Sequence, residues 1–263
     1  RDADLHDAKL RGANLKGAIL RAYLHDAKLG GANLRGAKLG GAKLQDADLR
    51  DADLRDAILV CSVCWSANLK GANLEGVKLT GADLHSANLR GAKLGGAILP
   101  DADLRVADLN GADLKGAILT GVDLHGAKLR GANLEGVVLT GANLISADLE
   151  GATLRYANLE GATLYDSNLK SANLRDADLQ DADLRDAKLG GAKLKGANLT
   201  GADLEGVDLK SANLEGANLE GVDLEGANLT GANLGGAHLA GAYFSDPELI
   251  RVNLSLADFD NAG

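Results

Sequence analysis

Leucine recurs at every fifth position along almost the whole chain, and this period constrains the fold more than any other feature. The spacing is strict from Leu5 to Leu20, shortens by one residue to reach Leu24, and then continues to Phe259. Leucine fills 49 of the 52 central positions, and alanine lies two residues earlier in 43 of them. The chain must therefore be analysed first as a repeat protein.

A period of five fits neither an α-helix nor a plain extended strand. Five residues advance an α-helix by about 500°, which would scatter the leucines over every face. Because five is odd, the two-residue alternation of a strand would place successive leucines on opposite faces. The chain must turn within each repeat. Ala and Leu then point inward, while Asn, Asp and Gly supply the turn.

The repeat motif points to a known family. Repeats of the form Ala-Asn-Leu-x-Gly and Ala-Asp-Leu-x-Gly, such as residues 72–76, resemble the pentapeptide-repeat family over the whole chain. The resemblance implies an all-β fold, a right-handed quadrilateral parallel β-helix with four repeats in each coil. The 52 repeats would then form about 13 coils, and a coil spacing of about 4.8 Å predicts a rod of about 60 Å.

Outward residues that break the consensus independently support a coil of four repeats. Their residue numbers differ by multiples of 20, as those of His25, His85 and His125 do. We therefore assign residues 1–243 to one β-helix with a one-residue slip between Leu20 and Leu24. Residues 244–263 are assigned to an irregular last coil and a C-terminal cap.

The C-terminal segment departs from the repeat. Pro247 replaces the inward alanine, Phe244 and Phe259 replace leucine, and Leu256 is expected to lie outside. The residues assigned to a cap or dimer contact are Phe244, Pro247, Leu249, Leu256 and Phe259. In related proteins the C-terminal end can form a dimer contact through aromatic residues, so the resemblance leaves both a cap and a homodimer open.

Two outward columns are candidates for recognition. The candidate interaction strip carries large aromatic and cationic side chains, which are favoured at interfaces, and comprises Trp65, His85, Arg105, His125, Ile145 and Tyr165. The candidate apolar patch comprises Ile58, Ile98, Ile118 and Val138, interrupted by Lys78. The alternatives are an ordinary outer ladder for the strip, and β-branched residues that suit an extended wall for the patch.

Charge is unevenly spread along the chain, whose net charge is −9. Residues 1–130 sum to +3 and residues 131–263 to −12. The candidate acidic patch comprises Asp203, Glu205, Asp223 and Glu225. It is interpreted either as a solvated end or as a surface for a basic partner protein.

Some members of the family that the chain resembles imitate duplex DNA and bind DNA gyrase or topoisomerase IV. A duplex of about 60 Å would carry about 35 phosphate charges, far more than this chain's net charge. Lys and Arg also occur on all four expected faces, and the central residue is Leu rather than Phe. Topoisomerase binding is therefore the alternative function. Nucleic acid is not an expected partner, because the basic positions lack interleaved aromatic residues.

The sequence predicts neither a catalytic nor a metal or cofactor site. Cys64 takes an inward Leu position and Cys61 an outward turn, so this single Cys-x-x-Cys pair is half of a structural zinc site at most. The histidines His6, His25, His85, His125 and His238 are not expected to cluster. We therefore predict a non-catalytic scaffold or protein-interaction rod, which could be the repeat region of a larger protein.

No apolar window is long enough for a membrane span, and no charged-then-apolar leader opens the chain. The chain opens on Arg1 within a repeat, so a processed, excised or unassigned N-terminus is expected. With only two cysteines there is no disulfide framework. A soluble protein is expected, with the cytoplasm favoured.

Overall fold

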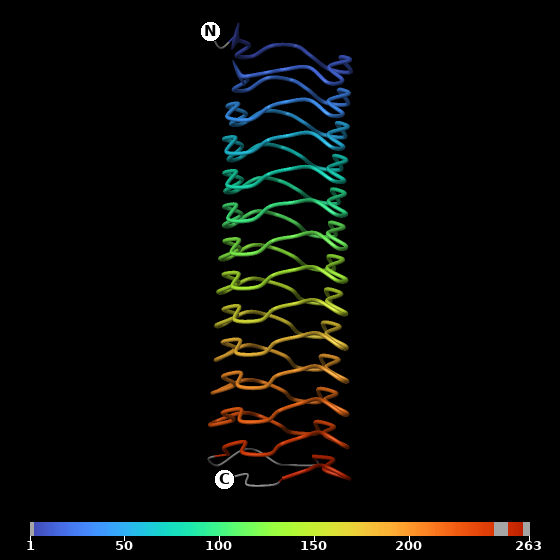
Figure 1. Ribbon diagram of the computed structural model, residues 1–263, viewed down its shortest axis with the longest axis vertical. Coiled ribbons are helices and arrows are strands. Elements are labelled where there is room, and N and C mark those ends of the chain that lie inside the picture. The colour runs from blue at the N-terminus through green and yellow to red at the C-terminus, as the bar shows by residue number, and fades with distance from the viewer. Residues whose placement is uncertain (1–2, 245–251, 260–263) are drawn as a thin grey trace. The chain divides into compact units, whose positions relative to one another are not determined.

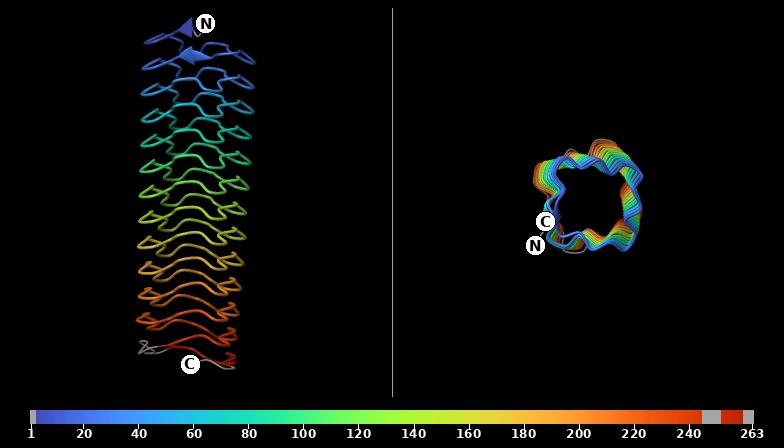
Figure 2. Two further views of the ribbon diagram at one scale, coloured as in Figure 1. Left: turned by 60° about the vertical axis from the view of Figure 1, so that its left-hand side comes forward. Right: turned by 90° about the horizontal axis from the view of Figure 1, so that it is seen from above.

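The computed structural model describes residues 3–244 and 252–259. The chain divides into two compact units, Arg1–Asn133 and Leu134–Gly263, called here the N-terminal and C-terminal units. Within each unit the backbone winds through stacked four-sided coils, as Figures 1 and 2 show. The architecture is the right-handed quadrilateral parallel β-helix that the sequence predicted.

Regular strands are short because each side of a coil is only a few residues long. Strand β1 (Ala3–Asp4) pairs in parallel with strand β2 (Ala22–Tyr23), and the other described coils are joined by single parallel bridges. The bridging residue is the one immediately before each central leucine, as in the bridge from Asn33 to Asp53. The part of the chain that the structure describes has no helix able to span a bilayer.

Each repeat turns at the residue two positions after the central leucine. At this turn position φ is positive, for example +66° at Gly31 and +56° at Asp51. The N–H of Ala32 donates to the carbonyl of Leu29 at 2.9 Å, which closes the turn around Gly31. A positive φ at the third residue of such a turn is typical of type II, and it explains why Gly, Asp and Ser fill most of these positions. The other described residues that adopt a positive φ there are Cys61, Val106, Tyr156 and Leu256.

The polar residue before each central leucine has a local role. The Oδ1 atom of Asn33 accepts a hydrogen bond from the N–H of Arg35 at 3.2 Å, across the corner. The backbone N–H of Asn33 donates to the carbonyl of Ala13 in the preceding coil at 2.9 Å. Asn and Asp therefore hold the corner with their side chains while their backbones join the coils.

The core is a stack of alanine and leucine side chains. From Leu24 to Ala242 the inward residues expose no more than 3% of their surface. Each such leucine contributes about 2 kcal/mol of apolar burial. In the first described coil Leu10 and Leu15 are only half-buried, because in this structure a coil is stacked on one side of them alone. Full burial of a leucine thus requires stacking on both sides.

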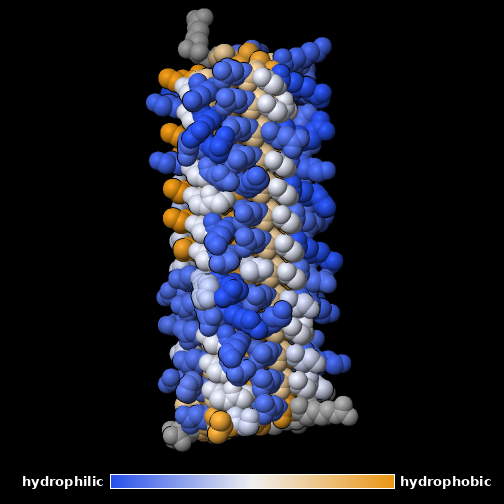
Figure 3. Space-filling view, turned by 90° about the vertical axis from the view of Figure 1, so that its right-hand side faces the viewer, coloured by the Kyte–Doolittle hydropathy of each residue, from blue (hydrophilic) through white to orange (hydrophobic). Residues whose placement is uncertain are grey.

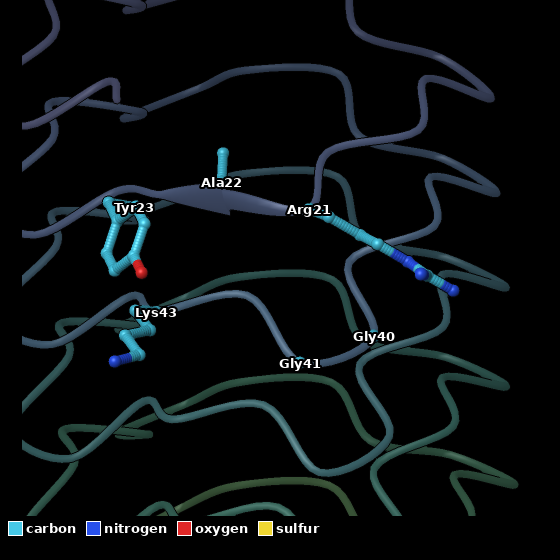
Figure 4. Close-up of a pocket in the computed structure, with 6 residues that line it drawn as sticks. All are labelled: Arg21, Ala22, Tyr23, Gly40, Gly41 and Lys43. Atoms are coloured by element: carbon cyan, nitrogen blue, oxygen red, sulfur yellow. The ribbon is translucent and has the colours of Figure 1, made fainter. Parts of the chain in front are cut away.

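The first coil is one residue shorter than the others. Lys9 pairs with Lys28, whereas Tyr23 pairs with Lys43, and the later described pairs keep this longer offset of four full repeats. The missing residue is a turn residue, since Ala22 follows Arg21 directly. Figure 4 shows this corner beside the next coil, where the six labelled residues line a hollow of about 270 Å³.

Candidate interaction surfaces

Outward side chains form columns because equivalent positions of successive coils lie directly over one another. The residue after each central leucine is placed by the backbone bonds that join the coils. The N–H of Ser66, for example, donates to the carbonyl of His85 at 2.9 Å, and the N–H of Ser86 donates to that of Arg105 at 2.9 Å. Side chains in one column are therefore spaced by about 4.8 Å along each unit.

The N-terminal unit holds Trp65, His85, Arg105 and His125 of the candidate interaction strip in one column. Trp65 is 40% exposed, His125 is exposed, and His85 is half-buried. The Nδ1 atom of His85 is buried and has no hydrogen-bond partner. The column therefore presents an aromatic ring, an imidazole and a guanidinium on consecutive coils.

The C-terminal unit holds Ile145 and Tyr165 of the strip. They share a column with Arg185, because the N–H of Ser146 donates to Tyr165 at 2.9 Å and that of Asp166 donates to Arg185 at 3.0 Å. Tyr165 is 41% exposed, and the guanidinium carbon of Arg185 lies 5.9 Å from its ring centroid. This column again presents an aromatic ring beside a cation.

The candidate apolar patch is interrupted by a lysine, and its four members are divided between the two units. Within the N-terminal unit Ile98 and Ile118 are adjacent, whereas Lys78 separates Ile98 from Ile58. Val138 belongs to the C-terminal unit. On the face drawn in Figure 3, hydrophobic side chains lie along one edge among hydrophilic ones.

One exposed member of the apolar column was missed from the sequence. Ile19 is 71% exposed and pairs with Lys38, which in turn pairs with Ile58. A strict spacing of four full repeats does not connect Ile19 to this column, because the first coil is one residue short. The offset across the slip would have identified it.

The candidate acidic patch lies in the C-terminal unit as two stacked pairs. Asp203 bridges to Asp223, and the coil that carries Glu205 is bonded to the one that carries Glu225. Glu205 and Glu225 are exposed. The Nε atom of Arg185 lies 3.4 Å from Asp203, so a cation borders the patch.

Wherever Asp-Leu-Arg occurs in a described repeat, the arginine folds back onto the aspartate through two hydrogen bonds. In the best-buried example, Arg50 donates from Nε and Nη2 to Asp48 at 2.7 Å each. The hydrogen bonds from Arg50 lower the pKa of Asp48 to about 2, although burial acts to raise it. Equivalent forks join Asp53 to Arg55, Asp103 to Arg105 and Asp183 to Arg185.

The Asp48 fork also receives a side chain from the first coil. Arg11 lies in the same column as Arg50, with Gly30 between them, and its Nη2 atom is 3.5 Å from Asp48. Gly30 has no side chain, and a Cβ atom there would come within 3.9 Å of the Asp48 carboxylate. The ion pair between Arg11 and Asp48 thus reaches across a whole coil, past a position that has no side chain.

The two cysteines lie apart in burial, as the repeat pattern predicted. Cys64 is buried and Cys61 is exposed at a turn with φ of +49°. Burial raises the pKa of the Cys64 thiol to about 12, although its contact with the Ser62 hydroxyl at 3.3 Å acts to lower it. A thiol in this environment stays protonated and behaves as a small apolar side chain.

The prediction that the histidines do not cluster is wrong for one pair. The rings of His6 and His25 lie edge to face with centroids 6.2 Å apart. Ligand atoms of His6, Asp7 and Asp26 all lie within 4.8 Å of one another. The sequence prediction compared positions at multiples of 20, whereas the slip places His6 over His25, one position short of that spacing.

At the C-terminal end the described residues keep the coil pairing. Asn233 bridges to Asn253 and His238 to Asp258. Leu256 is 94% exposed, Phe259 is 41% exposed, and Phe244 is half-buried. Pro247 and Leu249 lie outside the described residues, and the choice between a cap and a dimer contact stays a prediction.

The whole chain is similar to proteins of one family. The family model described as Pentapeptide repeats (8 copies) matches in overlapping segments that together span residues 1–261. Among solved structures, HetL, a pentapeptide repeat protein from the cyanobacterium Nostoc sp. strain PCC 7120, is 34% identical, with a TM-score of 0.58. The alignment covers 91% of this chain and 93% of HetL.

Two further solved structures share the repeat. A pentapeptide repeat protein from the Arabidopsis thaliana thylakoid lumen is 39% identical over 39% of this chain and 68% of its own, with a TM-score of 0.24. QnrB1, a plasmid-mediated fluoroquinolone resistance protein, is 22% identical over 74% of this chain and 88% of its own, with a TM-score of 0.39. No curated protein sequence matches at a significant level. The match of the family model along the chain, together with the likeness to HetL, shows that this protein belongs to the pentapeptide-repeat family.

Proposed function

We propose that this protein is a non-catalytic scaffold that binds another protein through the interaction strip of its N-terminal unit. The observation that carries the proposal is the column of Trp65, His85 and Arg105 on consecutive coils. Trp and Arg are the residues most enriched among those that dominate binding energy. The backbone ladder fixes their spacing in advance, so little conformational entropy is lost when a partner binds.

The Arg105 side chain of this strip is also held in place. Arg105 donates from Nε and Nη2 to Asp103 at 2.9 and 2.6 Å, and its Nε lies 3.7 Å from Asp123. The planar guanidinium keeps its orientation, and its apolar faces remain available to a partner.

The alternative is a DNA-mimicking protein that binds DNA gyrase or topoisomerase IV. Such mimicry needs a dense and unneutralised negative surface. Here Arg185 is within 3.4 Å of Asp203 at the border of the acidic patch, and it also forms a fork with Asp183. The scaffold is the function that these charges favour.

Affinity purification from cells of the source organism tests the proposal. The intact protein, a Trp65→Ala variant and a Tyr156→Ala variant would be compared by quantitative mass spectrometry. Tyr156 is the matched control, because it is 53% exposed and lies outside the strip. We expect a specific protein to be retained by the parent and by Tyr156→Ala, and to be depleted about tenfold or more by Trp65→Ala.

Equal retention by all three proteins would contradict a role for the strip. A gyrase supercoiling assay, with and without a quinolone, separates the alternative. The scaffold leaves supercoiling unchanged, whereas a topoisomerase regulator alters it. A change that persists in the Trp65→Ala variant would favour the alternative over the strip.

A further inference from the structure

The first two coils carry the same short sequence at the same corner. Residues 5–10 and 24–29 both read Leu-His-Asp-Ala-Lys-Leu, and their separation equals the pairing offset of the first coil, from Lys9 to Lys28. The two His-Asp pairs are therefore stacked directly over one another. The N–H of Asp7 donates to the carbonyl of His25 at 3.0 Å, which fixes the backbones of both pairs.

The side chains at this corner converge. The Nε2 atom of His6 lies 3.2 Å from Oδ2 of Asp7, and one ligand atom from each of His6, Asp7 and Asp26 lies within 4.8 Å of the others. The His25 ring packs edge to face on that of His6 at 6.2 Å. Among the described residues, no other group of three or more His, Cys, Asp or Glu side chains brings its ligand atoms this close together.

We propose that His6, Asp7, His25 and Asp26 form a binding site for a divalent transition-metal ion of the Zn²⁺ type. Zn–N and Zn–O distances of about 2.0–2.2 Å place tetrahedral ligand atoms about 3.4 Å apart. The ligand atoms of His6, Asp7 and Asp26 therefore have to close by at most about 1.4 Å, the difference between that spacing and 4.8 Å. His25, whose ring lies edge to face on that of His6, would supply the fourth ligand by rotation of its side chain. His6 and Asp7 are exposed and His25 and Asp26 half-buried, so rotation of their side chains can supply this movement.

The composition of the site selects the class of ion. Two imidazole nitrogens and two carboxylates suit Zn²⁺, Cu²⁺ or Ni²⁺, whereas Ca²⁺ and Mg²⁺ prefer a shell made of oxygen alone. The other histidines of the N-terminal unit lack this arrangement. His85 is followed by Ser86 and His125 by Gly126, so neither brings a carboxylate to its turn. A bound ion would cross-link the first coil to the second.

Isothermal titration of the intact protein with Zn²⁺ tests the site. We expect one tight site per chain in the parent. Loss of a direct ligand in His6→Ala or Asp26→Asn should weaken it by at least about tenfold, the lower bound seen even for outer-shell partners. Asn is chosen at position 26 because it tolerates the positive φ of +56° found there. His85→Ala is the matched control and should bind as the parent does.

Thermal melting with and without Zn²⁺ provides a second readout, because an ion that binds the folded state raises its stability by mass action. The rise should occur in the parent and in His85→Ala and be absent from His6→Ala. If His6→Ala does not fold, Asp26→Asn decides. The proposal is overturned if the parent does not bind Zn²⁺, or if His6→Ala and Asp26→Asn bind it as tightly as the parent does. It is also overturned if His85→Ala weakens Zn²⁺ binding as much as these variants do, or if Ca²⁺ binds with the same affinity as Zn²⁺.

Discussion

The first coil and the coils that follow it in the N-terminal unit obey the same repeat but differ in length and burial. The first is one residue shorter and has half-buried leucines, such as Leu10, whereas Leu94 in a later coil is fully buried. The missing residue after Arg21 removes one turn residue, yet the pairing resumes one repeat later. The difference teaches that register is set separately at each corner, while core stability depends on neighbours above and below.

The first coil also contacts the coils that follow it through its outward side chains. Arg11 reaches Asp48 past Gly30, and His6 packs on His25. Both contacts depend on the column geometry and not on the inward residues. The coil is therefore tied to its neighbours by its surface as well as by its backbone.

The largest effect should come from removing leucine side chains in the two kinds of coil. Leu94→Ala is expected to lower the free energy of unfolding by about 2–5 kcal/mol, because it leaves a cavity between stacked coils. Leu10→Ala should cost about half as much or less, since its side chain is already partly exposed. Urea denaturation of both variants measures the difference. Equal losses would mean that stacking on a second side adds nothing to burial.

The next effect concerns Asp48, which ties the first coil to the third. Its pKa is lowered from 3.8 to about 2, so its charge stabilises the fold above about pH 4, and this stability is lost as the pH falls from 4 towards 2. Asp48→Asn should therefore lower the free energy of unfolding at pH 7 by about 1–2 kcal/mol, with the difference shrinking in that acidic window.

Chemical denaturation from pH 7 down to pH 2 measures this dependence. Asp101→Asn is the control, because Asp101 is exposed at a turn and Asn keeps its positive φ. Arg11→Ala isolates the contribution of the first coil and should cost less than Asp48→Asn, since Arg50 remains. A difference between Asp48→Asn and the parent that stays constant from pH 7 to pH 2 would contradict the ion pair.

The smallest effect should follow from making the two kinds of coil equal in length. Inserting one glycine between Arg21 and Ala22 restores the missing turn residue. Its two backbone hydrogen bonds at about 0.5–1.5 kcal/mol each offset an ordering cost of about 1–2 kcal/mol, so stability should change by less than about 1 kcal/mol.

The matched control for the insertion is deletion of Gly91, which creates a second shortened coil, this time between two neighbours. It removes the bond from the Gly91 N–H to Asn110 and that from Ala92 to Leu89. We expect a loss of about 2 kcal/mol or more, because both adjoining coils must readjust. Guanidinium denaturation compares the two proteins. An insertion as damaging as the deletion would show that the register at Arg21 is not independent of the rest.

Much of the fold could be predicted from the sequence because its inward residues repeat almost without variation. The period of five requires a turn in every repeat, and the recurrences of His85 and His125 indicate the four-repeat coil. The composition of the turn position also follows, since only a few residue types accept a positive φ there at low cost. These features follow from the repeat itself and do not depend on which outward side chains meet.

The candidate site was harder to predict because it depends on which outward residues meet. The pairing of His6 with His25 and the place of Ile19 both require the offset across the slip, which a strict count of four full repeats conceals. The ion pair of Arg11 with Asp48 also depends on which side chains meet across the second coil, which is a property of the folded column. The missing turn residue thus concealed the first two of these features from the sequence analysis.

The positive φ at each corner has a wider consequence for how such a chain can change. The turn residue and the inward Ala–Leu pair determine the fold, so the residue after each leucine can vary widely. Gln45, Trp65 and His85, which share one column, illustrate this variety. Substitutions can therefore change this surface one residue at a time without any change in the core. A new binding preference therefore requires only a new set of outward side chains in one column, while the fold stays the same.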